Sequence, residues 1–167
     1  IEDCFKDAGY HENIFKNLCI PGTKVDNVIN NNKISAVTLT GSTPAGISVA
    51  KKAGENLKKT VLELGGSDPY LIFEDANIDI AVSACIDGRI LNAGQSCIAA
   101  KRLIITKNNE EDFIEKLKSQ LSLKIMGDPI DDVDIGPMVS NDSREEVHEQ
   151  VMNTIEAGAT LHIGGYI

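Results

Sequence analysis

The sequence lacks the features that usually mark proteins that bind nucleic acids, membranes or metal ions. Basic residues number 16 against 25 acidic ones, and the net charge of −9 repels phosphate backbones and anionic lipid surfaces. No apolar run approaches the roughly 20 residues that a membrane-spanning helix needs. The three histidines and four cysteines form no CxxC or HExxH pattern. We therefore expect no nucleic-acid partner, no membrane and no metal.

The cysteines and the first residues of the chain bear on its cellular context. Cys4, Cys19, Cys85 and Cys97 have spacings unlike a disulfide framework, so we expect reduced thiols in the cytoplasm. Residues 1–4 contain neither an initiator Met nor the basic stretch of a signal peptide. We expect both ends to be cut from a longer protein. The 167 residues, 42% of them hydrophobic, suit a globular protein of one domain or two small ones.

Strand-like and helix-like segments alternate along the chain, which predicts an α/β fold. Clusters of β-branched and apolar residues predict strands over residues 13–20, 36–40, 60–64, 69–73, 102–106 and 160–163. Apolar periodicity and capping residues predict helices over residues 43–56, 77–92 and 109–123 and one that begins at Ser143, with Thr43 as the N-cap of the first. Residues 26–32 are predicted as either a short helix or a loop.

Two of these helices have a recognisable inward face. The helix over residues 77–92 carries a stripe of small residues, which allows close packing on a sheet: Ala81, Ala84, Cys85 and Gly88. The helix over residues 109–123 turns its apolar residues toward the core: Phe113, Ile114, Leu117 and Leu121.

Cys97 is the candidate nucleophile. It lies in a glycine-containing loop, residues 92–97 (Asn-Ala-Gly-Gln-Ser-Cys), after a predicted helix. A nucleophilic cysteine needs access to solvent and a stabilised thiolate, and loop amides could also bind a developing oxyanion. The alternative is a structural cysteine. Cys85, on the small-residue stripe, is predicted to belong to the core.

Glu63 is the candidate general base. It stands between two leucines at the end of a predicted strand, just before Gly65 and Gly66. Partial burial would raise its pKa and suit it to accept a proton. The alternative is a carboxylate at a strand edge that faces solvent. The two glycines would let the backbone approach a ligand closely.

Residues 41–46, Gly-Ser-Thr-Pro-Ala-Gly, form a candidate phosphate site. They join a predicted strand to a helix N-terminus, where phosphates commonly bind. The segment lacks the Gly-Lys-Ser/Thr of a P-loop and the second glycine of Gly-x-Gly-x-x-Gly. Turn formation and helix capping explain it as well as dinucleotide binding does.

Taken together, three motifs resemble the aldehyde dehydrogenase superfamily. They are residues 39–46 (Leu-Thr-Gly-Ser-Thr-Pro-Ala-Gly), residues 62–69 (Leu-Glu-Leu-Gly-Gly-Ser-Asp-Pro) and residues 92–97, with 34 residues from Glu63 to Cys97. The order of the motifs fits the family. Four further segments resemble its succinate-semialdehyde dehydrogenase branch: residues 65–70, 88–89, 99–102 and 127–129. Arg89 is expected either to bind a substrate carboxylate or to form a salt bridge on the helix surface.

The resemblance implies a mechanism and site residues. Cys97 would attack the aldehyde carbon, hydride would pass to NAD or NADP, and Glu63 would activate the water that hydrolyses the thioester. Gly41, Ser42 and the helix start that includes Gly46 would lie near the cofactor pyrophosphate. Leu64 and Gly65 would lie near the nicotinamide.

The resemblance also implies a domain organisation. It predicts a three-layer αβα architecture in which residues 1–65 end an NAD(P)-binding domain and residues 66–167 begin a catalytic domain. Family members are far longer, and the full-length enzyme is expected to be a homo-oligomer that acts on a small-molecule aldehyde. The 167-residue chain by itself is expected to be inactive, that is, a catalytically incomplete fragment with a structural role or none. A cysteine acyltransferase or hydrolase that uses no nicotinamide is the remaining alternative.

Overall fold

Each of two units in the chain is built around a pair of parallel strands. The computed structural model describes residues 1–167, and contacts group them into Ile1–Gly65 and Gly66–Ile167. The sheet of the first unit is β1 paired with β2, and that of the second is β3 paired with β4. A helix connects the two strands of each pair, as parallel strands require. The predicted α/β class is confirmed.

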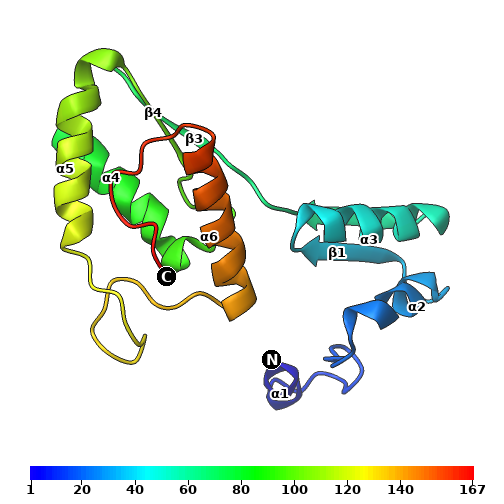
Figure 1. Ribbon diagram of the computed structural model, residues 1–167. Coiled ribbons are helices and arrows are strands. Elements are labelled where there is room, and N and C mark those ends of the chain that lie inside the picture. The colour runs from blue at the N-terminus through cyan, green and yellow to red at the C-terminus, as the bar shows by residue number, and fades with distance from the viewer. The chain divides into compact units, whose positions relative to one another are not determined.

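In the first unit, one helix connects the strands and packs on both of them. The unit contains α1 (Glu2–Asp7), the 3₁₀ turn η1 (Gly22–Lys24), α2 (Val25–Asn30), β1 (Ala36–Thr40), α3 (Thr43–Glu55) and β2 (Lys59–Glu63). Thr40 at the end of β1 lies opposite Glu63 at the end of β2. Figure 1 shows α3 lying along this strand pair. The carboxyl ends of both strands and the N-terminus of α3 therefore meet at one edge of the sheet.

The start of α3 is set by Ser42 and Gly46. Ser42, one residue before the predicted cap, is the N-cap, and its hydroxyl accepts a hydrogen bond from the Ala45 N–H at 3.4 Å. Serine and threonine can both cap a helix, with serine somewhat preferred, and Ser42 rather than Thr43 has the extended backbone of an N-cap. Gly46 is buried, and a Cβ there would lie 2.6 Å from a Leu64 methyl. This glycine lets the helix approach the residue that follows β2.

The second unit has a larger core between its sheet and two helices. It contains β3 (Pro69–Ile72), α4 (Ile78–Ile90), the short turn η2 (Leu91–Gly94), β4 (Arg102–Ile105), η3 (Lys107–Asn109), α5 (Glu110–Ser122) and α6 (Asn141–Glu156). α4 and α5 lie side by side (Figure 1). The buried core consists of Ile72, Val82, Cys85, Ile86 and Phe113.

The small-residue stripe of α4 explains only part of its packing. A Cβ on Gly88 would lie 2.5 Å from the Tyr70 hydroxyl, so the helix and β3 are as close there as predicted. Ala84, however, is exposed, and Val82 and Ile86 are buried in its place. Because α4 packs on Ile72 and Tyr70 of β3 and also on α5, its buried face is wider than one stripe.

Phe113 on α5 has no solvent exposure, and we expect Phe113→Ala to destabilise the second unit strongly. Removing a buried aromatic ring loses its transfer free energy and leaves a cavity, which costs about 3–5 kcal/mol. Chemical denaturation measures the change in the free energy of unfolding. Leu123→Ala is the control, because Leu123 follows the same helix and is 76% exposed. A loss below about 1 kcal/mol for Phe113→Ala would contradict the core described here.

Three further sequence predictions are wrong. Residues 13–20 and 160–163 form no strand, because neither segment pairs with a neighbouring strand, and apolar side chains such as Ile14 and Leu161 are exposed. α6 begins at Asn141 rather than at Ser143, and the hydroxyl of its N-cap Ser140 accepts the Ser143 N–H at 3.1 Å. Both serines lie in suitable contexts, and the preceding loop determines where the helix starts.

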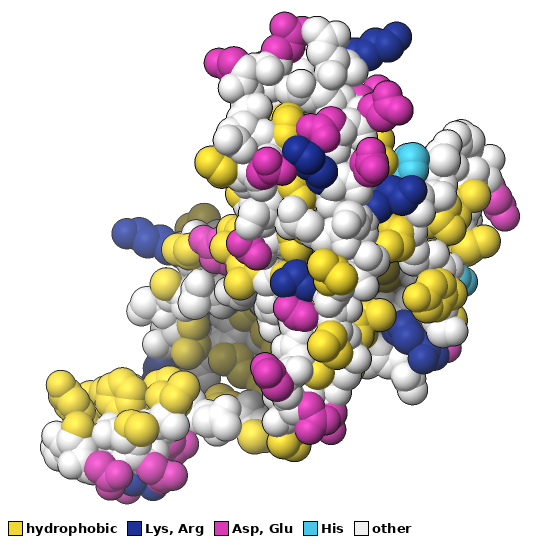
Figure 2. Space-filling view, turned by 90° about the vertical axis from the view of Figure 1, so that its left-hand side faces the viewer, with side chains coloured by type: hydrophobic (Ala, Val, Ile, Leu, Met, Phe, Trp, Pro, Cys, Tyr) yellow, Lys and Arg dark blue, Asp and Glu magenta, His cyan; other side chains and the backbone are white.

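The surface carries many large apolar side chains. Figure 2 shows hydrophobic side chains reaching the surface among acidic and basic ones. On the sheet of the second unit Leu71 and Ile104 are at least half exposed, and Phe73 just after β3 is 61% exposed. Apolar faces of this kind are typical of surfaces that contact other protein. No helix is both long enough and apolar enough to cross a membrane.

Candidate active site

Cys97 lies on a loop with unusual backbone conformation, which we call the cysteine loop (residues 91–101). Asn92, Ala93 and Gly94 all have positive φ, at 50°, 54° and 75°. Glycine adopts this region freely and asparagine does so readily, whereas for Ala93 the conformation costs about 1–2 kcal/mol. Such strain persists where surrounding contacts hold it, and it concentrates at functional sites. The backbone at Ala93, four residues before Cys97, is therefore held in a conformation that its own side chain does not favour.

Gln95 holds the cysteine loop to a segment more than 40 residues away in the sequence. Its side-chain Nε2 donates to the Pro137 carbonyl at 3.3 Å, and its Oε1 accepts the Val139 N–H at 2.8 Å. Its own backbone N–H donates to the Asn92 carbonyl at 3.0 Å. The side-chain amide of Gln95 thus binds one backbone carbonyl and one backbone N–H of residues 137–139, as the backbone of a neighbouring strand would. A groove of about 540 Å³ lies between these two segments.

Asp134 fixes the segment to which Gln95 is joined. Its carboxylate accepts the Ile125 N–H at 2.9 Å and the Lys124 ammonium at 2.8 Å. The backbone hydrogen bond from Ile125, followed by the bond from Lys124, lowers the pKa of the Asp134 carboxyl. Residues 124–139 are folded back on themselves by these bonds, and Met126 forms an isolated parallel bridge with Ile135.

This carboxylate should make stability depend on pH. Because the pKa of Asp134 is lower in the folded chain than in the unfolded one, its stabilisation is fully present above the unfolded value of about 4 and is lost as the pH falls through the folded value. We expect the difference in Tm between the wild type and Asp134→Asn to be largest at neutral pH and to shrink under acid. Thermal unfolding of both proteins from pH 7 to pH 3 measures this. A constant difference would contradict the assignment.

Accessibility separates Cys97 from the core cysteine. Cys97 is exposed, as a thiol that meets a substrate must be, whereas Cys85 is buried in the core. Burial raises the pKa of the Cys85 thiol and so disfavours its nucleophilic form. Gly66, the first residue of the second unit, lies next to the cysteine loop, because a Cβ on Gly66 would lie 3.5 Å from the Cys97 carbonyl oxygen.

The other predicted site residues gather at the sheet edge of the first unit. Gly41 donates its N–H to the Glu63 carbonyl at 2.9 Å, and Leu64 packs against Gly46. Gly41 and Ser42 are exposed at this edge. Glu63 is exposed as well, because it ends β2 with its side chain uncovered, so the partial burial expected for this carboxylate is wrong. In parallel α/β sheets, ligands bind outside the carboxyl ends of the strands. Gly65 is the last residue of the unit, so Glu63 and Cys97 belong to different units.

Arg89 forms no salt bridge, so the salt-bridge alternative for this residue is wrong. Its Nη1 lies 3.5 Å from the Ala100 carbonyl, and a Cβ on Gly94 would lie 2.8 Å from its Nη2. The guanidinium therefore packs against the backbone of the cysteine loop, near the C-terminus of α4, where a positive charge is favoured.

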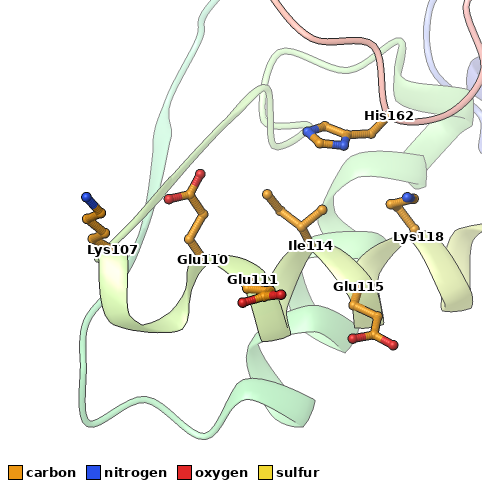
Figure 3. A pocket seen from close by; sticks show the side chains of 7 residues that line it. All are labelled: Lys107, Glu110, Glu111, Ile114, Glu115, Lys118 and His162. Carbon is orange, nitrogen blue, oxygen red and sulfur yellow. The ribbon is translucent and has the colours of Figure 1, made fainter.

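A second groove, of about 580 Å³, lies on α5 away from the predicted site residues. Figure 3 shows the His162 imidazole above Ile114, with charged side chains along the helix on either side. Its lining residues are Lys107, Glu110, Glu111, Ile114, Glu115, Lys118 and His162. None of the residues predicted to act in catalysis or cofactor binding is among them.

Comparison with known proteins identifies the family. The family model described as "Aldehyde dehydrogenase family" matches residues 1–166. The chain belongs to the aldehyde dehydrogenase family. The resemblance predicted from the three motifs is thereby confirmed.

Aldehyde dehydrogenases of known name or structure match nearly the whole chain. A Mycobacterium avium (strain 104) protein named succinate-semialdehyde dehydrogenase (NADP(+)) is 42% identical over 166 residues, which cover 99% of this chain and 35% of that protein. The crystal structure of succinic semialdehyde dehydrogenase from Streptococcus pyogenes in complex with NADP+ matches with a TM-score of 0.95 and 35% identity, over 99% of this chain and 37% of that one. Lactaldehyde dehydrogenase from Escherichia coli matches with a TM-score of 0.82 and 32% identity, over 85% of this chain and 30% of that one. The chain thus spans about a third of the length of these aldehyde dehydrogenases.

Two polar residues beside Cys97 were missed from the sequence. Gln95 and Lys101 flank the cysteine at two and four residues, and both side chains bind backbone groups of the cysteine loop or its neighbour. The available signal was a long polar side chain next to a glycine-containing turn. Their partners lie in loops that have no periodic pattern, so the pairing could not be read from the sequence.

Proposed function

We propose that this chain supplies the thiol nucleophile and a general base for the oxidation of succinate semialdehyde to its acid with NAD(P)+. The observation that carries the proposal is the exposed Cys97 on a strained, tethered loop, in a chain of the aldehyde dehydrogenase family. Relatives named for succinate semialdehyde support this substrate, and the NADP+ complex of one of them supports the cofactor. In this proposal residues 1–65 are part of an NAD(P)-binding domain and residues 66–167 part of a catalytic domain.

The sheet edge of the first unit fits a phosphate-bearing cofactor. Gly41 and Ser42 are exposed between the end of β1 and the N-terminus of α3, a helix of 13 residues. Backbone N–H groups at a helix start, together with its dipole, favour an anion. The close contact of Gly46 with Leu64 brings this helix start to the end of β2. Gly41, Ser42 and Gly46 would hold the pyrophosphate, and Leu64 and Gly65 would lie by the nicotinamide, which when bound supplies a hydride acceptor.

The chain's own residues perform the covalent and proton-transfer chemistry. The Cys97 thiolate adds to the aldehyde carbon, and the Cys97 N–H donates to the oxygen that becomes negative in the thiohemiacetal. At the thioester stage, the Glu63 carboxylate takes a proton from water, whose oxygen adds to the thioester carbon. The carbon–sulfur bond then breaks, which releases the acid and returns the thiolate.

Calorimetric titration of the 167-residue chain with NAD+ and with NADP+ tests the proposal. Micromolar binding of either dinucleotide, retained in Cys97→Ala, would support it, and assays with succinate semialdehyde would follow. No binding at millimolar cofactor would contradict it for this chain. That outcome would favour the alternative of a catalytically incomplete unit.

A further inference from the structure

The ammonium group of Lys101 binds three carbonyl oxygens of the cysteine loop. Its Nζ donates to Ser96 at 3.0 Å, to Cys97 at 3.1 Å and to Ala99 at 3.2 Å. An ammonium has three N–H donors, so these carbonyls use all of them. No carboxylate pairs with Lys101 within this unit, and its side chain is exposed. The long Lys101 side chain could extend into water. Instead it binds backbone carbonyls on both sides of Cys97.

The three bonds constrain the direction of the amide groups next to the cysteine. All peptide bonds in the chain are trans, so each carbonyl points opposite to the N–H of the following residue. Carbonyls of Ser96 and Cys97 that face Lys101 therefore turn the N–H groups of Cys97 and Ile98 away from it. Neither of these two N–H groups has an acceptor within the second unit, whereas the Ala99 N–H binds the Ser96 carbonyl and the Ala100 N–H binds the Gly88 carbonyl.

We propose that Lys101 is a positioning residue, which by binding the carbonyls of Ser96, Cys97 and Ala99 aims the Cys97 and Ile98 N–H groups at the oxyanion of a substrate on Cys97. The inference rests on the proposed nucleophilic role of Cys97, and it adds Ile98 N–H as a second donor. Two neighbouring amides that point the same way form an anion-binding concavity. Lys101 touches no reacting atom and acts only through the backbone.

The test compares two reactions of the Cys97 thiol in the full chain. With p-nitrophenyl acetate, the sulfur attacks the ester carbonyl, an oxyanion forms, and p-nitrophenolate leaves as the thioester is made. With iodoacetamide, the sulfur displaces iodide and no oxyanion forms. We expect Lys101→Met to slow acylation by about 10- to 100-fold, because misplaced donors lose part of what a deleted donor costs. Alkylation of Cys97, measured by peptide mass, should change less than about threefold, since it needs only an accessible thiolate.

Two further variants and a second measurement make the test decisive. Lys101→Arg keeps the charge and should recover acylation to within about tenfold of the wild type. Lys118→Met, on α5, is the matched control and should match the wild type. Equal losses in both reactions for Lys101→Met, or no loss in either, would overturn the proposal.

Hydrogen exchange separates this proposal from the assignment of Cys97. Loss of the ammonium should free the loop, so the Ala99 N–H, bonded to Ser96 at 3.1 Å, should exchange at least about tenfold faster in Lys101→Met. Unchanged exchange would overturn the role of Lys101 even if acylation fell. A wild-type chain that p-nitrophenyl acetate does not acylate would instead contradict the proposed nucleophile, while the exchange result would still decide whether Lys101 holds the loop.

Discussion

Cys97→Ala is expected to abolish covalent acylation of the chain. The side chain is the only part of the cysteine loop that offers a nucleophilic sulfur, and the other thiol of its unit, Cys85, is buried. Removing the nucleophile of a covalent catalyst commonly costs on the order of 10⁴–10⁶ in rate. We expect p-nitrophenolate release to fall to the background of the uncatalysed reaction. Mass spectrometry should show no acetyl adduct on the peptide that contains residue 97.

The exposed cysteines of the first unit provide the control for this variant. Cys19 is accessible but lies outside the cysteine loop, so Cys19→Ala should retain the acylation rate of the wild type. If Cys97→Ala kept a substantial part of the rate, or if the adduct mapped to residue 4 or 19, the assignment of the nucleophile would be wrong. A difference between the two variants also shows that accessibility alone does not make a thiol reactive.

Glu63→Gln is expected to stop turnover after the first covalent step. Glutamine keeps the shape of the side chain but cannot accept a proton, and loss of a general base costs about 10²–10⁴ in rate. If Glu63 activates the hydrolytic water, formation of the acyl adduct should stay nearly normal while its breakdown slows. Pre-steady-state kinetics should therefore show a full burst of p-nitrophenolate followed by a slow steady state. The acetylated chain should accumulate in its mass spectrum.

The shape of the time course decides what Glu63 does. A smaller burst with an unchanged steady state would mean that Glu63 serves the attack of the thiol rather than the hydrolysis. Unchanged kinetics would mean that this exposed strand-end carboxylate takes part in neither step, as the alternative interpretation holds. Glu12→Gln is the matched control, because Glu12 is an exposed carboxylate of the same unit outside the strands.

Burial and tethering distinguish the two cysteines of the second unit more sharply than sequence context does. Cys85 and Cys97 are 12 residues apart, and both lie near glycine and small residues. The helix carries Cys85 into the core, and the left-handed turn at Asn92, Ala93 and Gly94 brings Cys97 to the surface. The contrast arises because helix α4 ends between the two cysteines. Cys85 lies on the helix, whereas the backbone at Cys97 belongs to a loop whose conformation depends on its contacts.

The sequence by itself determined the elements whose signals are local. β1 has the predicted bounds, because Val37, Thr38 and Thr40 have high β-propensity and the turn at Gly41 follows at once. α5 was predicted to within about a residue, because its apolar period and its acidic first turn agree. The three motifs likewise predicted the family, since their order and spacing are properties of the chain alone.

Only the tertiary structure decided which segments pair and how the cysteine loop is held. Residues 13–20 have the composition of a strand but form none, because a strand needs a partner and no strand lies beside them. The contacts of Gln95 with residues 137–139, and of Lys101 with three carbonyls, join groups that no periodicity connects. Hydrogen bonds to loop backbone depend on which loops come together when the chain folds, and the order of residues in the sequence does not indicate this.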